Sequence, residues 1–181
     1  MTKLASKDLL VPDLRKLIRD IPDFPKKGIL FKDITPLLGD IQGFKRTIDL
    51  MSEPFLHKDV RKVAGIESRG FLLATAIAYR LGAGVIPIRK KGKLPHKVVS
   101  TTYALEYGMD TVEAHADALE PGEKVLLVDD VLATGGTAAA SCALLELLKA
   151  KIVGVSFLIE LDFLKGRGKL PSYDIHSLIH Y

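Results

Sequence analysis

The sequence has little of what cross-links a chain or anchors it in a membrane. Cys142 is its one cysteine, which excludes an internal disulfide and a metal site built from several cysteines. No apolar run approaches the roughly 18–20 residues that a membrane-spanning helix needs. Residues 1–16 also lack the apolar core of a signal peptide. We therefore expect a cytoplasmic protein.

Two common nucleotide-binding motifs are absent as well. The sequence has no G-x-x-x-x-G-K-[ST] segment, the mark of P-loop nucleotidases, and no G-x-G-x-x-G segment, the mark of dinucleotide-binding folds. A site for a phosphorylated ligand would have to be built in another way.

The composition is that of one ordinary globular domain, residues 1–181, with a small excess of positive charge. The chain is 48% hydrophobic and carries a net charge of +4. Basic residues gather at 89–97 and 165–169. Such clusters suit nucleic acid or a small polyanion such as a phosphorylated metabolite, and the composition leaves both open.

The hydrophobic pattern alternates strands with helices. Strands are predicted at 62–66, 85–90, 125–130, 152–160 and 173–181, and helices at 8–20, 41–57, 71–81 and 137–149. This alternation indicates an α/β fold with a mostly parallel central sheet flanked by helices. The strand at 173–181 is expected at an edge, and the polar segment 91–116 is expected to form a flap on the sheet.

One segment, VLLVDDVLATGGT, carries the chemistry. Asp129 and Asp130 end a buried strand, and ligands of open α/β sheets bind beyond the carboxyl ends of the strands. The ATGGT loop that follows offers backbone N–H groups, the hydroxyls of Thr134 and Thr137, and a helix N-terminus, all of which suit a phosphate. Carboxylates suit hydroxyls or a metal that the ligand carries. A ligand with both features is a ribose 5-phosphate, although an aspartate that merely caps the helix is the plainer alternative.

This segment resembles the phosphoribosyl-pyrophosphate (PRPP) signature of the type I phosphoribosyltransferases. Further segments resemble the adenine phosphoribosyltransferases in particular, in that family's order: DFPKKGILFKDITPLL, GIESRGF, IRKKGKLP, LEYG and IELDFLKGR. The resemblance implies the type I phosphoribosyltransferase fold, with an N-terminal hood at 1–40 and a flexible flap at 91–116. The sequence departs from the family at His96, where the family usually has glycine, and this departure concerns the path of the flap.

The resemblance also implies an activity. The family transfers ribose 5-phosphate from PRPP to N9 of adenine, which yields AMP and pyrophosphate and salvages purines. It uses Mg²⁺ and forms homodimers. The chain would hold no metal directly, because Mg²⁺ would arrive with PRPP, with Asp129 and Asp130 as the residues that could contact it.

The resemblance assigns site residues in four groups. The catalytic residues would be Glu106 and Arg69. The ribose phosphate of PRPP or AMP would bind Asp129, Asp130, Ala133, Thr134, Gly135, Gly136 and Thr137. Pyrophosphate would bind Glu67, Ser68, Arg69, Arg89, Lys90 and Lys93. Adenine would lie against Phe31 and Leu161, with Leu30 and Lys32 reading its edge through backbone groups. The family further suggests a cis peptide bond between Glu67 and Ser68.

Two other functions stay open at this point. The chain could be a phosphoribosyltransferase for another base, such as hypoxanthine or xanthine. It could also be a PRPP-sensing regulator that binds nucleic acid, although residues 1–60 show no convincing helix-turn-helix. We expect the enzyme, with neither nucleic acid nor membrane as a partner.

Overall fold

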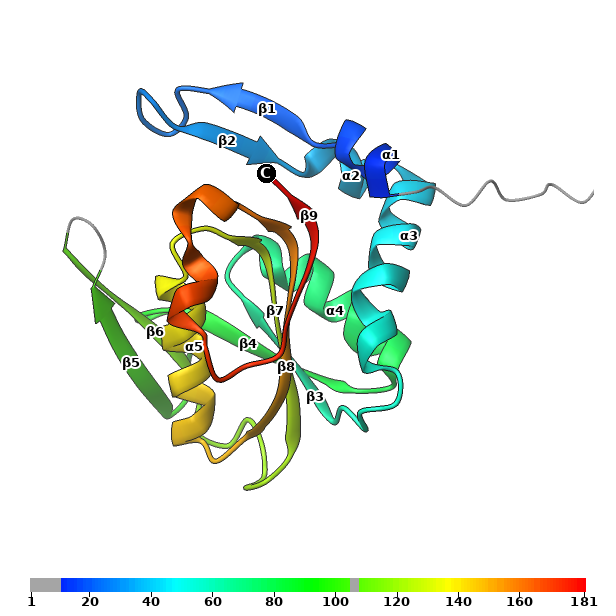
Figure 1. The fold of residues 1–181 in the computed structure, drawn as a ribbon. Helices are drawn as coiled ribbons and strands as arrows, with labels where there is room; N and C mark the ends of the chain where they lie inside the picture. Colours follow the sequence, from blue (N-terminus) through cyan, green and yellow to red (C-terminus); the bar gives the residue numbers. More distant parts are fainter. Residues whose placement is uncertain (1–10, 105–107) are drawn as a thin grey trace, which may run out of the picture. The chain divides into compact units, whose positions relative to one another are not determined.

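The structure is a computed structural model that describes residues 11–104 and 108–181 (Figure 1). The chain forms two compact units, 1–50 and 51–181. The organisation as one phosphoribosyltransferase domain stays a prediction.

The first unit contains a short antiparallel sheet and helices. Its elements are α1 (Val11–Lys16), β1 (Arg19–Pro22), β2 (Leu30–Asp33), α2 (Thr35–Gly39) and most of α3 (Ile41–Ser52). The predicted helix over 8–20 is wrong beyond residue 16. Residues 19–22 instead pair with β2, Ile21 opposite Phe31, and this pairing with a distant segment overrides the helical spacing.

The described part of the second unit is built on a seven-stranded sheet in the order β5-β6-β4-β3-β7-β8-β9 (Figure 1). The strands are β3 (Lys62–Ile66), β4 (Gly84–Lys90), β5 (Val98–Ala104), β6 (Met109–His115), β7 (Lys124–Leu132), β8 (Lys151–Glu160) and β9 (Ile175–His180). Five strands run parallel, from β4 to β9 in the sheet order, and β5 and β6 are antiparallel. The α/β fold with a mostly parallel sheet is confirmed, and β9 lies at its edge as predicted.

Helices α4 (Arg69–Leu81) and α5 (Gly136–Leu147) cover opposite faces of this sheet. Val125 and Leu127 of β7 belong to the core cluster that contains α5. The alternating residues Leu126 and Val128 therefore face the side of α4. Three short 3-10 turns complete the unit: η1 (Glu53–Phe55), η2 (Asp162–Leu164) and η3 (Gly166–Lys169). Among the described residues, no helix is long and apolar enough to cross a membrane.

The connections reverse direction between β3 and β7. The chain leaves β3 through α4 to reach β4 on one side, and leaves β7 through α5 to reach β8 on the other. Ligands of open α/β sheets bind at this switch point, where the loops after the two strands diverge. The two loops are residues 67–68 and 133–135.

Candidate active site

Asp129 and Asp130 lie in β7 at the switch point. The sequence predicted that these two residues end the strand. The strand instead continues to Leu132, so they lie near its carboxyl end. Asp130 is 5% exposed. Burial raises the pKa of Asp129 well above its ordinary value, and the negative charge of Asp130 raises it further. Two partly desolvated carboxylates are thus held side by side.

Arg69, the first residue of α4, provides the counter-charge. Its guanidinium lies 2.7 Å from Asp130 Oδ2. The neighbouring Gly70 lets the start of α4 lie close to β7, because a methyl group at Gly70 would lie 2.7 Å from Asp129 Oδ1. Sequence reasoning did not single out Gly70, although it stands in the quoted GIESRGF segment. The ion pair joins the first residue of α4 to β7 at the switch point.

The phosphate-type loop, residues 133–137, has the glycine turn and helix start that the sequence predicted. Gly135 adopts a left-handed conformation, φ 77°, directly before α5 begins at Gly136. This conformation is open to glycine and costly for other residues. Residues 133–137 thus present a glycine turn and a helix N-terminus beside the two aspartates, the arrangement that suits a phosphate.

The loop after β3 brings most of the expected pyrophosphate residues together. The peptide bond between Glu67 and Ser68 is cis, as the family resemblance suggested. Glu67 accepts hydrogen bonds from Lys93 Nζ at 2.5 Å and from the Lys90 backbone N–H at 3.0 Å, and Arg89 Nε lies 3.4 Å away. Burial acts to raise the pKa of Glu67, but these hydrogen bonds hold it below its ordinary value. Cations from β4 and the segment after it therefore surround this loop.

The side chain of Lys90 has a different partner. It forms an ion pair with Asp110 and donates a hydrogen bond to the Tyr103 hydroxyl at 3.1 Å. Burial acts to lower the pKa of Lys90, but the bonds to Asp110 and Tyr103 raise it above its ordinary value. To bind pyrophosphate, Lys90 would have to leave Asp110.

Tyr103 links the β5–β6 hairpin to the phosphate-type loop, a connection that sequence reasoning missed. Its hydroxyl lies 3.2 Å from Asp110 Oδ2 and 3.0 Å from Thr137 Oγ1. Lys90 can only donate and the Asp110 carboxylate can only accept. The single Tyr103 proton therefore goes to Asp110, and Thr137 donates its proton to Tyr103. No local pattern marks this contact, because the two residues are 34 positions apart.

Tyr103→Phe should lower the free energy of unfolding by about 0.5–1.5 kcal/mol, the usual contribution of a hydrogen bond. The change deletes the hydroxyl and leaves the ring in place. Urea denaturation of the variant and of the wild type measures the effect. Equal stability of the two proteins would show that the Tyr103 hydroxyl contributes nothing.

The residues predicted to contact adenine lie in both units. Leu30, Phe31 and Lys32 form most of β2, where Phe31 makes an edge contact with the Phe24 ring at 5.1 Å between centroids. The Lys32 ammonium lies 2.7 Å from Asp20 Oδ1. Leu161 follows β8, and its N–H donates to the Leu132 carbonyl at 3.0 Å. Glu106, the predicted catalytic carboxylate, lies outside the described residues.

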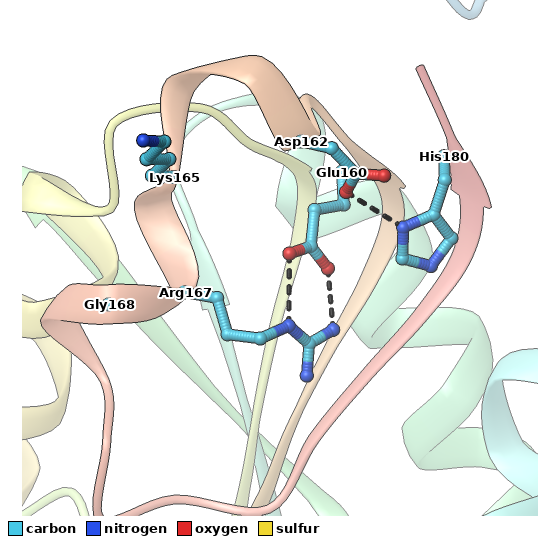
Figure 2. A pocket seen from close by; sticks show the side chains of 6 residues that line it. All are labelled: Glu160, Asp162, Lys165, Arg167, Gly168 and His180. Atoms are coloured by element: carbon cyan, nitrogen blue, oxygen red, sulfur yellow. Dashed lines mark hydrogen bonds and ion pairs between the residues drawn. The ribbon is translucent and has the colours of Figure 1, made fainter.

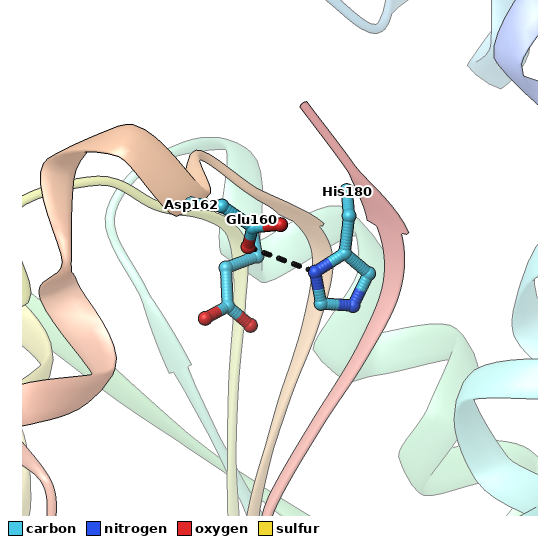
Figure 3. Close-up of side chains that lie close together, drawn as sticks. All are labelled: Glu160, Asp162 and His180. Atoms are coloured by element: carbon cyan, nitrogen blue, oxygen red, sulfur yellow. Dashed lines mark hydrogen bonds and ion pairs between the residues drawn. The ribbon is translucent and has the colours of Figure 1, made fainter.

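A cluster with the composition of a metal site lies where the ends of β8 and β9 meet η2. Ligand atoms of Glu160, Asp162 and His180 are within 4.8 Å of one another (Figure 3). Both carboxylates already have partners, however. Arg167 donates two hydrogen bonds to Glu160, and His180 Nδ1 lies 2.9 Å from Asp162 Oδ1. We interpret the cluster as ion pairs that stabilise the segment after β8.

Comparison with known proteins places this site in a family. Residues 40–177 match the model of the phosphoribosyl transferase domain. The chain is 56% identical over 168 residues to the adenine phosphoribosyltransferase of Nitrosococcus oceani, which covers 93% of this chain and 98% of that protein.

Solved structures agree. The crystal structure of adenine phosphoribosyltransferase from Rhodothermus marinus is 49% identical, with a TM-score of 0.92 over 94% of this chain and 98% of the other. The Saccharomyces cerevisiae enzyme, solved with an imino-altritol bisphosphate and adenine, is 40% identical, with a TM-score of 0.88 over 93% and 97%. The chain therefore belongs to the phosphoribosyl transferase domain family and, within it, to the adenine phosphoribosyltransferases.

Proposed function

We propose that the protein transfers ribose 5-phosphate from PRPP to N9 of adenine, giving AMP and pyrophosphate in purine salvage. The observation that carries this proposal is the Arg69–Asp130 pair at the switch point, beside the glycine turn of residues 133–137. This arrangement offers acceptors for ribose hydroxyls, donors for a phosphate and a cation for a leaving group within one short stretch of the sheet edge.

Each group of site residues has its own role in this reaction. The loop 133–137 binds the 5-phosphate, and Asp129 and Asp130 accept hydrogen bonds from the ribose hydroxyls. Arg69, with Arg89 and Lys93 released from Glu67, neutralises the charge that develops on pyrophosphate. Glu106 exchanges a proton with the base at N7, a general acid–base role. Ser68 and Glu67 shape the pyrophosphate loop, and Lys90 joins it on leaving Asp110.

Mg²⁺ fits this site. Carboxylate oxygens are the protein ligands that Mg²⁺ prefers, usually one or two of them together with substrate phosphates and water, and Asp129 and Asp130 provide them. The ion would supply electrostatic stabilisation of the departing pyrophosphate. The chain's own part is to orient the ribose hydroxyls and to hold the counter-charge of Arg69.

We also propose a homodimer in the cytoplasm. An apolar strip on α4 supports the dimer: Leu72 and Tyr79, seven residues apart on one helix face, are 53% and 91% exposed. Val85 of β4 is 43% exposed. Light scattering on purified protein measures the mass, and a monomer at micromolar concentration would contradict this part of the proposal.

Incubation with adenine, PRPP and Mg²⁺ tests the activity. AMP and pyrophosphate should appear in equal amounts and only when all three are present. Hydrolysis of PRPP without AMP, or salt-sensitive binding of nucleic acid in place of turnover, would refute the proposal.

Asp129→Asn should raise the free energy of unfolding at pH 7 by about 0.5–2 kcal/mol, as stabilising changes at functional sites commonly do. An unfolded aspartate titrates near pH 3.9, whereas the pKa of Asp129 is well above that in the folded protein. The folded state therefore binds more protons between the two values, and stability falls as pH rises through this window.

Thermal denaturation from pH 3.5 to pH 7 measures this effect. The advantage of the variant should grow with pH and vanish below about pH 4. The same variant should use PRPP roughly 5–30-fold less well, because an amide binds a hydroxyl without charge assistance. A variant that is less stable than the wild type at pH 7 would contradict the raised pKa of Asp129.

A further inference from the structure

The segment that follows β8 lies against the phosphate-type loop through backbone alone. A methyl group at Gly166 would overlap the Ala133 carbonyl oxygen and lie 2.9 Å from the Gly135 nitrogen. A methyl group at Gly135 would in turn overlap the Gly166 carbonyl oxygen. The two loops thus meet at Gly166 with no side chain between them.

Arg167 anchors this segment to the sheet. Its guanidinium donates to both oxygens of Glu160, at 3.0 Å and 2.6 Å (Figure 2). It also donates to the Ile175 carbonyl at 3.1 Å. Glu160 is 5% exposed. A planar guanidinium that binds a carboxylate through two bonds fixes the direction of the residue as well as its charge. Gly166, the preceding residue, is therefore held in place from β8 and β9.

We propose that Gly166 and Arg167 are positioning residues for the 5-phosphate of PRPP. This inference rests on the proposed function. Gly166 packs closely against the peptides of Ala133 to Gly135 and thereby fixes the direction of their N–H groups. Arg167 and Glu160 hold Gly166 at the distance that this packing needs. A shift of the loop by even part of an ångström would weaken several charge-assisted hydrogen bonds at once.

Gly166→Ala tests the proposal, and Gly168→Ala is the matched control. A methyl group at Gly168 meets nothing within 4 Å, and neither glycine has a left-handed φ. Gly166→Ala should raise the KM for PRPP roughly 10–100-fold, the loss expected when a hydrogen bond to a charged group is broken. Its kcat at saturating PRPP should stay within about threefold of the wild type, because the lost contacts bind substrate and transition state alike.

Direct binding separates the possible failures. Calorimetry with ribose 5-phosphate should show the same 10–100-fold loss for Gly166→Ala, whereas the affinity for magnesium pyrophosphate should match the wild type. Wild-type protein that binds neither ligand would refute the proposed function. Wild-type and Gly166→Ala proteins that bind ribose 5-phosphate equally would refute the positioning role alone.

Arg167→Lys provides a second route if Gly166→Ala does not fold. Lysine keeps the charge but cannot form the two parallel bonds to Glu160. The KM for PRPP should rise about 3–10-fold, with pyrophosphate affinity again unchanged. Equal losses of ribose 5-phosphate and pyrophosphate affinity would indicate general loosening of the fold and overturn the proposal.

Discussion

Adenine should be used at least about 10⁴-fold better than hypoxanthine, measured as kcat/KM at saturating PRPP. Adenine offers a donor at N6 and an acceptor at N1, and a 6-oxopurine reverses this pattern. A site that hydrogen-bonds the first pattern leaves buried polar groups unpaired with the second. Discrimination of this size follows from unpaired groups and does not need steric exclusion.

The first unit explains why the backbone would read the base. In the described residues β2 pairs with β1 alone, so one edge of β2 keeps backbone groups outside the ladder. The Lys32 side chain is only 8% exposed and is paired with Asp20, so a role in reading the base would fall to the backbone of β2. Peptide groups cannot exchange donor and acceptor by rotation, as a side-chain amide can. We therefore predict that Leu30 and Lys32 set the selectivity through backbone groups.

A chemical control sharpens this test. 2,6-Diaminopurine keeps the N6 donor and the N1 acceptor, so its kcat/KM should lie closer to that of adenine than to that of hypoxanthine. If hypoxanthine is used within tenfold of adenine, the selectivity mechanism is wrong.

Arg69→Met should lower kcat roughly 10²–10³-fold, the loss typical when one preorganised charge-stabilising group is removed. Arg69 follows the pyrophosphate loop directly and pairs with Asp130, one of the two ribose carboxylates. Its side chain is 31% exposed, so a ligand can reach it without unfolding of α4. Methionine keeps much of the length and apolar contact of arginine but cannot neutralise charge. Single-turnover formation of AMP measures the effect.

A double variant separates catalysis from stability. Breaking a fully buried ion pair costs roughly 3–5 kcal/mol, and the loss for Arg69→Met should be smaller because Arg69 is partly exposed. In an Asp130→Asn background the stability cost should largely disappear, whereas the loss of kcat should persist. Recovery of kcat in the double variant would mean that Arg69 only neutralises Asp130.

Local patterns were sufficient to predict the parallel part of the sheet. The strand at 62–66 has the predicted bounds, and α4 ends at Gly82 in a left-handed conformation, as the glycine indicated. These elements are buried and have strong apolar runs, so their pattern and their burial agree. The glycine turn at 135 could also be predicted from the sequence, because its left-handed conformation favours glycine.

Contacts between distant segments were not predictable in this way. Strand β1 stands where part of a helix was predicted. Its pairing with β2, eight or more residues further along the chain, leaves no mark in the local spacing of apolar residues. The hydrogen bond between Tyr103 and Thr137 and the backbone contact of Gly166 depend on how loops from different strands meet. The cis bond between Glu67 and Ser68 came from family resemblance and not from any periodicity.

A crystal structure with AMP and magnesium pyrophosphate tests the central claim most directly. The 5-phosphate should lie within hydrogen-bond distance of backbone N–H groups of residues 134–137, with the ribose hydroxyls on Asp129 and Asp130 and pyrophosphate beside Arg69. The alternative site would be the open cavity of about 620 Å³ where Lys165 and Arg167 lie beside the carboxylates of Glu160 and Asp162 (Figure 2). A 5-phosphate bound in that cavity, with the 133–137 loop unoccupied, would contradict the account.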